Sequence, residues 1–261
     1  MKKIILPIFS LTLLFLTKPV LADFNQALSD FRYQLAEYAT FHGDYQTSRA
    51  SYLQFKSLPA EKDAFEKTKK VLIARNKTLE AYFFLLQEKI NQTQNIEKED
   101  FDDVSTKLKS ETEFLKNQRQ KLEESQIISQ LETLSKELEA EDKEFKDLAE
   151  EATSLTILGQ LFSGFQSHQT LQQKISQAIE ERPQAIKDKA LIERWMGESE
   201  KDAQDSIAKR NEAREILHQF LQEKSYKKDQ VLANLKKQLK IAKDLLEKAT
   251  SAQEQVARRI S

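Results

Sequence analysis

The stretch ATSLTILGQLFSGFQSHQTLQQ, residues 152–173, contains no charged side chain, although 32% of the residues in the chain are Asp, Glu, Lys or Arg. It also contains Gly159 and Gly164, which are two of the four glycines in the chain. Long segments of charged, helix-forming residues lie on both sides of it. We interpret this uncharged stretch as either the turning point or the buried centre around which those helices are arranged.

The apolar side chains of the uncharged stretch cover more than one face of a helix: Ile157, Leu158, Leu161, Phe162 and Phe165. Such breadth indicates burial against several neighbours or against a partner. At the tip of a hairpin these residues would be exposed and would form a docking site. In the middle of a bundle they would be core. Burial is the usual fate of such side chains, so core is the favoured interpretation and a docking surface is the alternative.

Glycine and proline are scarce throughout the chain, with four of each among 261 residues, whereas average proteins contain about 7% and about 5%. The turns and bulges of β-sandwiches and barrels depend on these residues, so the composition argues against such folds. Most of the remaining residues favour helices. We predict an all-α fold of long antiparallel helices with heptad packing, either an elongated helical bundle or a set of coiled-coil hairpins.

Residues 1–22 have the pattern of an export signal peptide. Lys2 and Lys3 precede an apolar run at 4–16, and the segment ends in residues that suit cleavage after Ala22. The apolar run is shorter than the roughly 20 residues needed to span a bilayer. We therefore expect an exported protein, located in the periplasm, outside the cell or in the cell envelope. A retained N-terminal anchor is the alternative.

Residues 23–92 show the clearest periodicity. Aromatic side chains recur there at every seventh position: Phe24, Phe31, Tyr38, Tyr45 and Tyr52. Pro59 ends this pattern and suits the first turn of a following helix. We predict an N-terminal αα-hairpin, with one helix running through Gly43 and the aromatic column forming core rather than a binding face.

Two further regions complete the predicted organisation. Residues 93–183 form a central helical region that contains the uncharged stretch, with a change of heptad phase near Glu124 and a boundary at Pro183. Residues 184–261 form a C-terminal helical hairpin, with Ser225 as the cap of the last helix.

Opposite charges suggest which helices are neighbours. Residues 132–151 contain nine acidic and three basic side chains, whereas residues 224–261 contain ten basic and four acidic ones. We predict that the last helix packs antiparallel to the 132–151 segment, although each exposed ion pair contributes only about 0–1 kcal/mol.

Four lysines cluster in the last helix: Lys236, Lys237, Lys240 and Lys243. They would suit contact with an anionic membrane surface or envelope polymer. A solvated helix face, or the intramolecular pairing described above, is the more common explanation of such a cluster. Nucleic acid is not expected as a partner, because the chain without its signal peptide is mildly acidic.

Motifs for catalysis or metal binding are few. The chain has no cysteine, which excludes disulfides, thiolate-bound metal and a thiol nucleophile. Glu215 and His218 have the spacing of half a di-iron site, but the second half is missing. Ser206 and Lys209 have a serine–lysine spacing without the accompanying motifs. We expect no cofactor, no metal and no enzyme activity.

The sequence therefore predicts a non-catalytic exported protein. We expect it to act through helix surfaces as an extracytoplasmic scaffold, adaptor or client-holding protein, with a protein partner or a second copy of itself. A peripheral protein that binds the envelope or membrane surface through the basic last helix is the alternative. A helical-bundle ligand binder or enzyme is the third reading.

Overall fold

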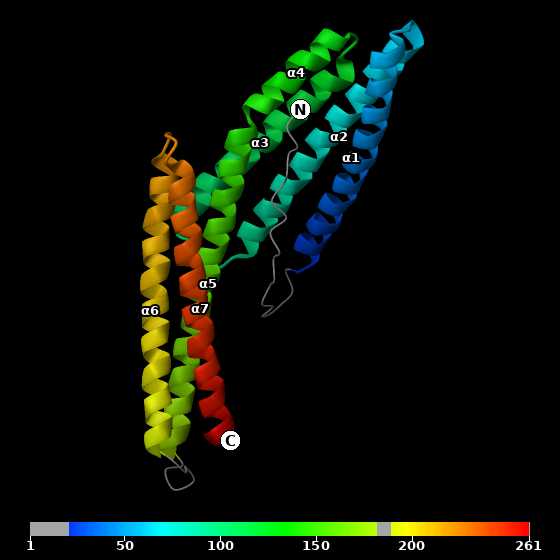
Figure 1. The fold of residues 1–261 in the computed structure, drawn as a ribbon. Coiled ribbons are helices and arrows are strands. Elements are labelled where there is room, and N and C mark those ends of the chain that lie inside the picture. Colours follow the sequence, from blue (N-terminus) through cyan, green and yellow to red (C-terminus); the bar gives the residue numbers. More distant parts are fainter. Residues whose placement is uncertain (1–20, 182–188, 261) are drawn as a thin grey trace.

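The computed structural model describes residues 21–181 and 189–260, and within these ranges every regular element is an α-helix (Figure 1). The helices are long and pair in antiparallel hairpins, so the predicted all-α, elongated fold is confirmed. The predicted signal peptide lies outside the described residues except for its last two positions. The predicted boundary at Pro183 also lies outside them.

Three hairpins and one long helix make up the described chain. The first hairpin is α1 (Leu21–Phe55) and α2 (Leu58–Gln92), the second is α3 (Lys98–Glu124) and α4 (Ile128–Ala140), and the third is α6 (Lys189–Gln222) and α7 (Lys228–Ile260). The long helix α5 (Asp142–Glu181) follows α4 and has 40 residues. At 40 residues it is about 60 Å long.

Local chemistry explains the turn between α1 and α2. As predicted, α1 continues as one helix through Gly43. It ends where Lys56 adopts a left-handed backbone conformation with a φ of 45°. The Ser57 hydroxyl then accepts a hydrogen bond from the Ala60 amide at 3.4 Å, and Pro59 occupies the first turn of α2. A serine cap followed by proline is a strong start signal for a helix.

The other two turns are only partly as predicted. The change of heptad phase near Glu124 is a turn, because α3 ends there and α4 begins at Ile128. The prediction that Ser225 caps α7 is wrong. Ser225 lies within the α6–α7 turn, where its hydroxyl accepts a hydrogen bond from the Lys227 amide at 3.2 Å, and the helix begins only at Lys228. The chain needs these additional residues to reverse its direction.

All three hairpin turns point toward the upper end of the molecule in Figure 1, which we call the turn end, and the C-terminus lies toward the opposite end. The α6–α7 turn stands apart from the other two, because Lys228 beside it pairs with Asp147 of α5, a full helix past the α3–α4 turn. Helices α1, α3 and α6 run toward it, whereas α2, α4, α5 and α7 run away from it. Side-chain contacts agree with these directions. For example, α5 is parallel to α2, because Asp142 pairs with Arg75 and Gly159 lies beside Gln94 farther along both elements.

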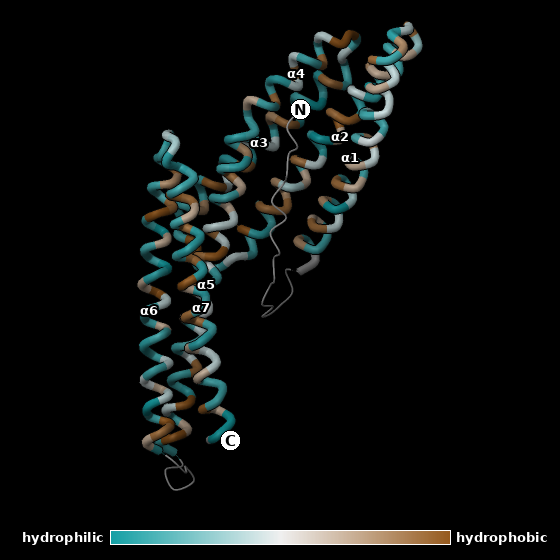
Figure 2. Tube along the Cα trace, in the orientation of Figure 1, coloured by the Kyte–Doolittle hydropathy of each residue, from teal (hydrophilic) through white to brown (hydrophobic). Residues whose placement is uncertain are grey.

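Helix α5 joins two packing units. Its first half packs with α2, α3 and α4 and also contacts the start of α7, and its second half packs with α6 and α7. One hydrophobic core spans both units, and it includes side chains exposed by 2% or less from five helices: Phe83, Leu115, Leu155, Leu217 and Leu235. Figure 2 shows apolar residues spaced among polar ones along the helices, as amphipathic packing requires.

Helix α1 is the outermost element. Among the described helices it contacts α2 alone. Its aromatic column faces that helix: Phe24 is buried, and the ring of Phe31 lies 5.3 Å from the ring of Tyr82. The three tyrosines of the column are half-buried. The column therefore forms the seam of the first hairpin.

Candidate functional site

The uncharged stretch lies in the middle of α5 as uninterrupted helix. Its interpretation as a turning point or hairpin tip is therefore wrong. Leu158, Leu161 and Phe165 are buried, and Ile157 and Phe162 are half-buried. The physical reason is that the α2–α3 loop, α6 and α7 all pack around this part of α5. The five predicted site residues belong to the core or its margin.

Gly159 allows the α2–α3 loop to lie directly on α5. A Cβ atom at this position would come within 2.6 Å of the carbonyl oxygen of Gln94. Beside it, Asn95 has a φ of 62°, a conformation that asparagine tolerates better than most residues. Its side-chain amide donates to Ser163 Oγ at 2.9 Å and to Gln166 Oε1 at 3.0 Å. The polar residues of the uncharged stretch thus bind a neighbouring loop.

Gly164 has a similar role toward α7. A Cβ atom there would lie 2.7 Å from a methyl carbon of Leu246. Close approach continues between α6 and α7, where Ala203, Ala242 and Ala249 are fully buried. Small residues bring these helices together, which builds a tight three-helix unit from the second half of α5, α6 and α7.

A buried arginine ties α6 to the first packing unit. The Arg210 side chain is 5% exposed and donates to the Leu158 carbonyl at 3.3 Å and to Glu97 at 3.0 Å. Its guanidinium carbon lies 5.3 Å from the centroid of the Phe162 ring. One turn along α6, Arg214 pairs with Glu97 as well. Burial opposes ionisation of Glu97, but hydrogen bonds from the backbone and Arg210 outweigh it and lower the Glu97 pKa.

The opposite charges of α7 and the acidic segment do meet. Lys228 lies 2.6 Å from Asp147, and Lys236 lies 2.7 Å from Glu150. The predicted antiparallel direction is wrong, however, because α7 runs parallel to α5 and antiparallel to α6. The short α6–α7 turn makes those two helices antiparallel neighbours, and charge alone carries no information about direction.

The four clustered lysines do not form one free basic face. Lys236 is half-buried beside Glu150, and Lys243 lies 3.5 Å from Glu247 on the same helix. Lys237 and Lys240 are exposed. Part of the cluster therefore serves intramolecular pairing, which was one of the two explanations offered for it.

A serine and a histidine lie within hydrogen-bond distance between α5 and α6. The Nε2 atom of His168 is 2.8 Å from Ser199 Oγ. Ser199 donates its proton to the Ala249 carbonyl at 2.8 Å, and both residues of the pair are 2% exposed or less. An activated nucleophile needs access to substrate and a proton directed at its base. This pair meets neither requirement.

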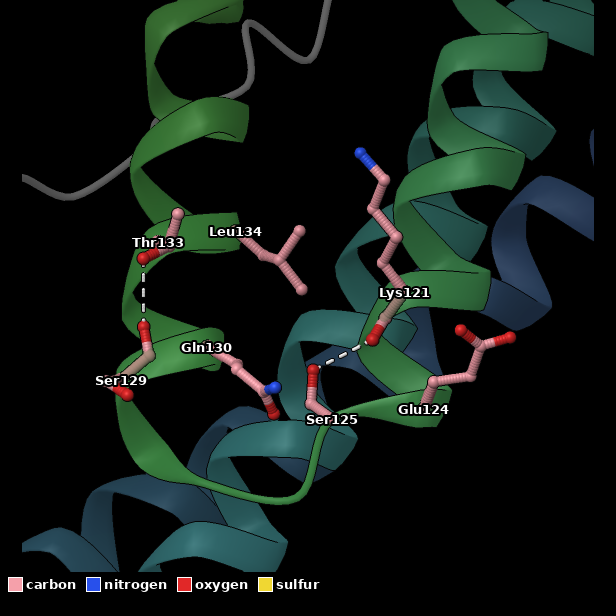
Figure 3. Close-up of a pocket in the computed structure, with 7 residues that line it drawn as sticks. All are labelled: Lys121, Glu124, Ser125, Ser129, Gln130, Thr133 and Leu134. Atoms are coloured by element: carbon pink, nitrogen blue, oxygen red, sulfur yellow. Dashed lines mark hydrogen bonds between the residues drawn. The ribbon is translucent and has the colours of Figure 1, made fainter.

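Figure 3 shows a hollow between the end of α3 and the start of α4. Two of its hydroxyls donate to backbone carbonyls of their own helix: Ser125 to Lys121 at 2.8 Å, and Thr133 to Ser129 at 2.9 Å. The Gln130 carboxamide oxygen accepts from backbone amides of the turn. The polar groups of the hollow thus complete the α3–α4 turn, and nothing in it converges on a ligand.

Metal-binding groups are not brought together within residues 21–181 and 189–260, where no set of three or more His, Asp or Glu side chains could hold an ion. Glu215 and His218 lie on α6, and His218 Nε2 is 3.9 Å from Asp100 of α3. None of the helices in the described part of the chain is long and apolar enough to cross a membrane.

Exposed large apolar side chains are found mainly at the hairpin turns. Eight large hydrophobic residues are exposed in the described part of the chain, and six of them lie at the three hairpin turns. They are Leu53 (52%), Phe55 (64%) and Leu58 (78%) at the first turn, Ile127 (56%) and Ile128 (45%) at the second, and Tyr226 (85%) at the third. We call these six the turn residues. The α2–α3 loop differs, because its Ile96 packs against the core.

Analysis of the sequence missed the turn residues because it followed heptad columns, and these residues lie outside them. The usable signal was the presence of large apolar residues where a turn is expected to be polar. Phe55 and Leu58 flank the break at Ser57, and Ile127 and Ile128 follow the change of heptad phase.

Comparison of the chain with protein-family models, with curated proteins and with solved structures found no match.

Proposed function

We propose that the protein is a non-catalytic scaffold or adaptor that binds a protein partner through the turn residues. The observation that carries this proposal is that six of the eight exposed large apolar side chains of the described residues lie at the three hairpin turns, five of them at the α1–α2 and α3–α4 turns, which lie at the same end of the molecule (Figure 1). Single exposed apolar residues are ordinary on protein surfaces, but their concentration indicates an interaction site. Aromatic side chains such as Phe55 and Tyr226 are frequent anchors in interfaces.

Charges near the turn residues favour a protein partner over an anionic membrane. Exposed Lys56 adjoins Phe55, and exposed Lys227 adjoins Tyr226. At the second turn, however, the exposed residues Glu123 and Glu124 are acidic, and Lys69 of α2 donates to the Glu123 and Ser125 carbonyls. An anionic bilayer would attract the lysines at the first and third turns and repel the glutamates at the second turn. A protein surface with an apolar centre and charges of both signs suits all three turns.

The architecture supports a scaffold. Long helices carry the three turns, and the central core and the Arg210 contacts join the two packing units. Export with cleavage after Ala22 belongs to the same proposal. The mass of the protein recovered outside the cytoplasm tests it, since a cleaved chain begins at Asp23.

Binding to an anionic envelope surface is the second candidate, and exposed Lys237 and Lys240 are the observation that favours it. It is the weaker one, because Lys236 and Lys243 are engaged within the molecule.

Site-specific photo-crosslinking in the native host distinguishes the two. A benzophenone side chain placed at Phe55 or at Tyr226 samples two different turns. The same group at Tyr33, which is 60% exposed on α1 but remote from the turns, is the matched control. We expect one protein to be crosslinked from both turns and not from Tyr33. Equal crosslinking from Tyr33, or none from the turns together with salt-sensitive binding to phosphatidylglycerol vesicles, contradicts the proposal.

A further inference from the structure

One buried histidine in the three-helix unit has a ring nitrogen without a partner. His168 is 2% exposed, and its Nδ1 atom has no hydrogen-bond partner among the described residues. The single proton of the Ser199 hydroxyl goes to the Ala249 carbonyl at 2.8 Å. Ser199 Oγ is therefore the acceptor in its 2.8 Å contact with His168 Nε2. This fixes the neutral ring with its proton on Nε2 and leaves Nδ1 unprotonated.

The His168 surroundings link all three helices of the unit. On α7, Gln253 is fully buried and donates to the His168 backbone carbonyl at 3.0 Å and to Gln172 of α5 at 2.9 Å. The hydrogen bonds from His168 to Ser199 and from Ser199 to Ala249 thus link α5 to α6 and α6 to α7. Gln253 links α7 to α5 in turn.

Charged groups give a protonated His168 little support. On α6, Glu200 is the acidic residue that favours a positive ring. Asp202 of the same helix is already paired with Lys248 of α7 at 2.9 Å. The side chains that bond beside the ring from α5 and α7, Gln172 and Gln253, are neutral amides. Protonation would place a charge and an unsatisfied N–H group in the interior, which is costly.

We propose that His168 is a pH-sensitive latch that holds α5, α6 and α7 together in its neutral form and loosens them when it is protonated. The inference stands on the hydrogen bonds and burial of His168, independently of the proposed function. Its consequence would be a scaffold whose second packing unit, including the α6–α7 turn, responds to mild acid.

Burial lowers the pKa of His168, with Glu200 opposing the shift, so the sign of the pH effect follows. As pH falls, the unfolded chain takes up this proton before the folded protein does. Stability from the latch is complete above the ordinary histidine pKa of about 6.5 and is lost progressively below it. Lowering the pH from 7.5 to 5.5 raises the equilibrium constant for unfolding by up to about tenfold through the protonation of His168 alone.

Trp195 is the only tryptophan of the chain and packs on α6 beside Ile192, Ile175 and Val256, so its fluorescence reports on this unit. Urea unfolding at the two pH values is compared for the natural protein and His168→Gln. We expect the natural protein to lose several-fold more stability in acid than this variant does. The matched control is His218→Gln on α6, where the histidine side chain is 39% exposed, and this variant should keep the natural acid response.

An equal acid response in the natural protein and His168→Gln would overturn the latch. Should His168→Gln fail to fold, NMR titration of the natural protein decides the question. We expect the His168 ring to remain neutral at and somewhat below the ordinary histidine pKa of about 6.5. Titration of His168 near pH 6.5, with the folded spectrum unchanged, would also overturn the proposal.

Discussion

Gly159 of α5 lies so close to Gln94 of the α2–α3 loop that a Cβ atom at the glycine would be 2.6 Å from the glutamine's carbonyl oxygen. At this point the first hairpin rests on the long helix through backbone atoms. Arg210 reaches the same region from α6 and bonds Leu158 and Glu97. The two packing units are therefore joined at the centre of the uncharged stretch.

Gly159→Ala should destabilise the protein by up to about 2 kcal/mol. Alanine is better than glycine within a helix by roughly 1 kcal/mol, but the overpacking against loop backbone costs about 1–3 kcal/mol. Urea unfolding measures the change. Gly43→Ala and Gly197→Ala are matched controls, because a Cβ atom there meets nothing within 4 Å. Both should stabilise, by about 0.5–1 kcal/mol. Stabilisation by all three substitutions would contradict the close contact at Gly159.

Two non-glycine residues in the described part of the chain have a positive φ, and substitution by glycine should affect protein stability differently at the two positions. Lys56 has a φ of 45° at the end of α1, so Lys56→Gly removes strain and should stabilise by up to about 1 kcal/mol. Asn95 has a φ of 62°, but Asn95→Gly also removes the hydrogen bonds to Ser163 and Gln166. We expect it to be neutral or destabilising by about 1 kcal/mol. The midpoint temperatures of thermal unfolding of the two variants test this contrast. A change of the same sign and size in both variants would contradict it.

Arg210→Met should destabilise by about 2–3 kcal/mol. Removing one partner of a buried ion pair costs roughly 3–5 kcal/mol, and the loss is smaller here because Glu97 is 35% exposed and keeps Arg214 at 3.6 Å. Arg210→Lys should recover only part of this, because one ammonium group cannot reproduce the guanidinium's contacts. Arg194→Ala, at an exposed pair on the same helix, should change stability by less than about 0.5 kcal/mol. A similar effect at both sites would contradict the role of Arg210.

Glu151→Gln should stabilise the protein by about 1 kcal/mol at pH 7.5. Burial raises the pKa of Glu151 although Lys107 lies 3.0 Å away, and Lys107 keeps Asp103 at 2.6 Å when the carboxylate is removed. A raised pKa means that the folded protein holds this proton more tightly, so stability falls as pH rises above about 4.5. The pKa of Lys107 is also raised, despite its own burial, because two carboxylates share it. Glu151 is the more buried partner and governs the effect.

The measurement is urea unfolding at pH 5 and pH 7.5. The gain from Glu151→Gln should shrink at the lower pH, where the natural residue takes up its proton. Asp103 contacts the same lysine, Lys107, but its side chain is 55% exposed. Asp103→Asn should therefore show neither the gain in stability nor its dependence on pH. A gain of the same size at both pH values would contradict the raised pKa.

Local chemistry made the helices and several of their ends predictable. Pro59 marked the first turn correctly, because proline geometry acts within a few residues. Scarcity of glycine and proline was enough to exclude sheet folds. The chain direction of α7 was predicted wrongly, because the attraction between Lys236 and Glu150 is the same whichever way the helices run.

The uncharged stretch shows the limit of pattern analysis at the level of the site. Its breadth of apolar residues correctly indicated several neighbours, but nothing local states that one of them is the loop at Gln94. The turn residues were not predicted at all. Their exposure depends on where the chain reverses, and Phe55 and Ile127 carry no periodic signal of their own.

The affinity of the crosslinked partner for defined variants tests the central claim most directly. Phe55→Ser combined with Leu58→Ser removes two exposed side chains and should leave stability within about 0.5 kcal/mol of the natural value. Isothermal titration should show at least tenfold weaker binding for this double variant, about 1.4 kcal/mol, and unchanged binding for Tyr33→Ser. Natural affinity in a folded double variant would contradict the assignment of the turn residues as the partner-binding surface.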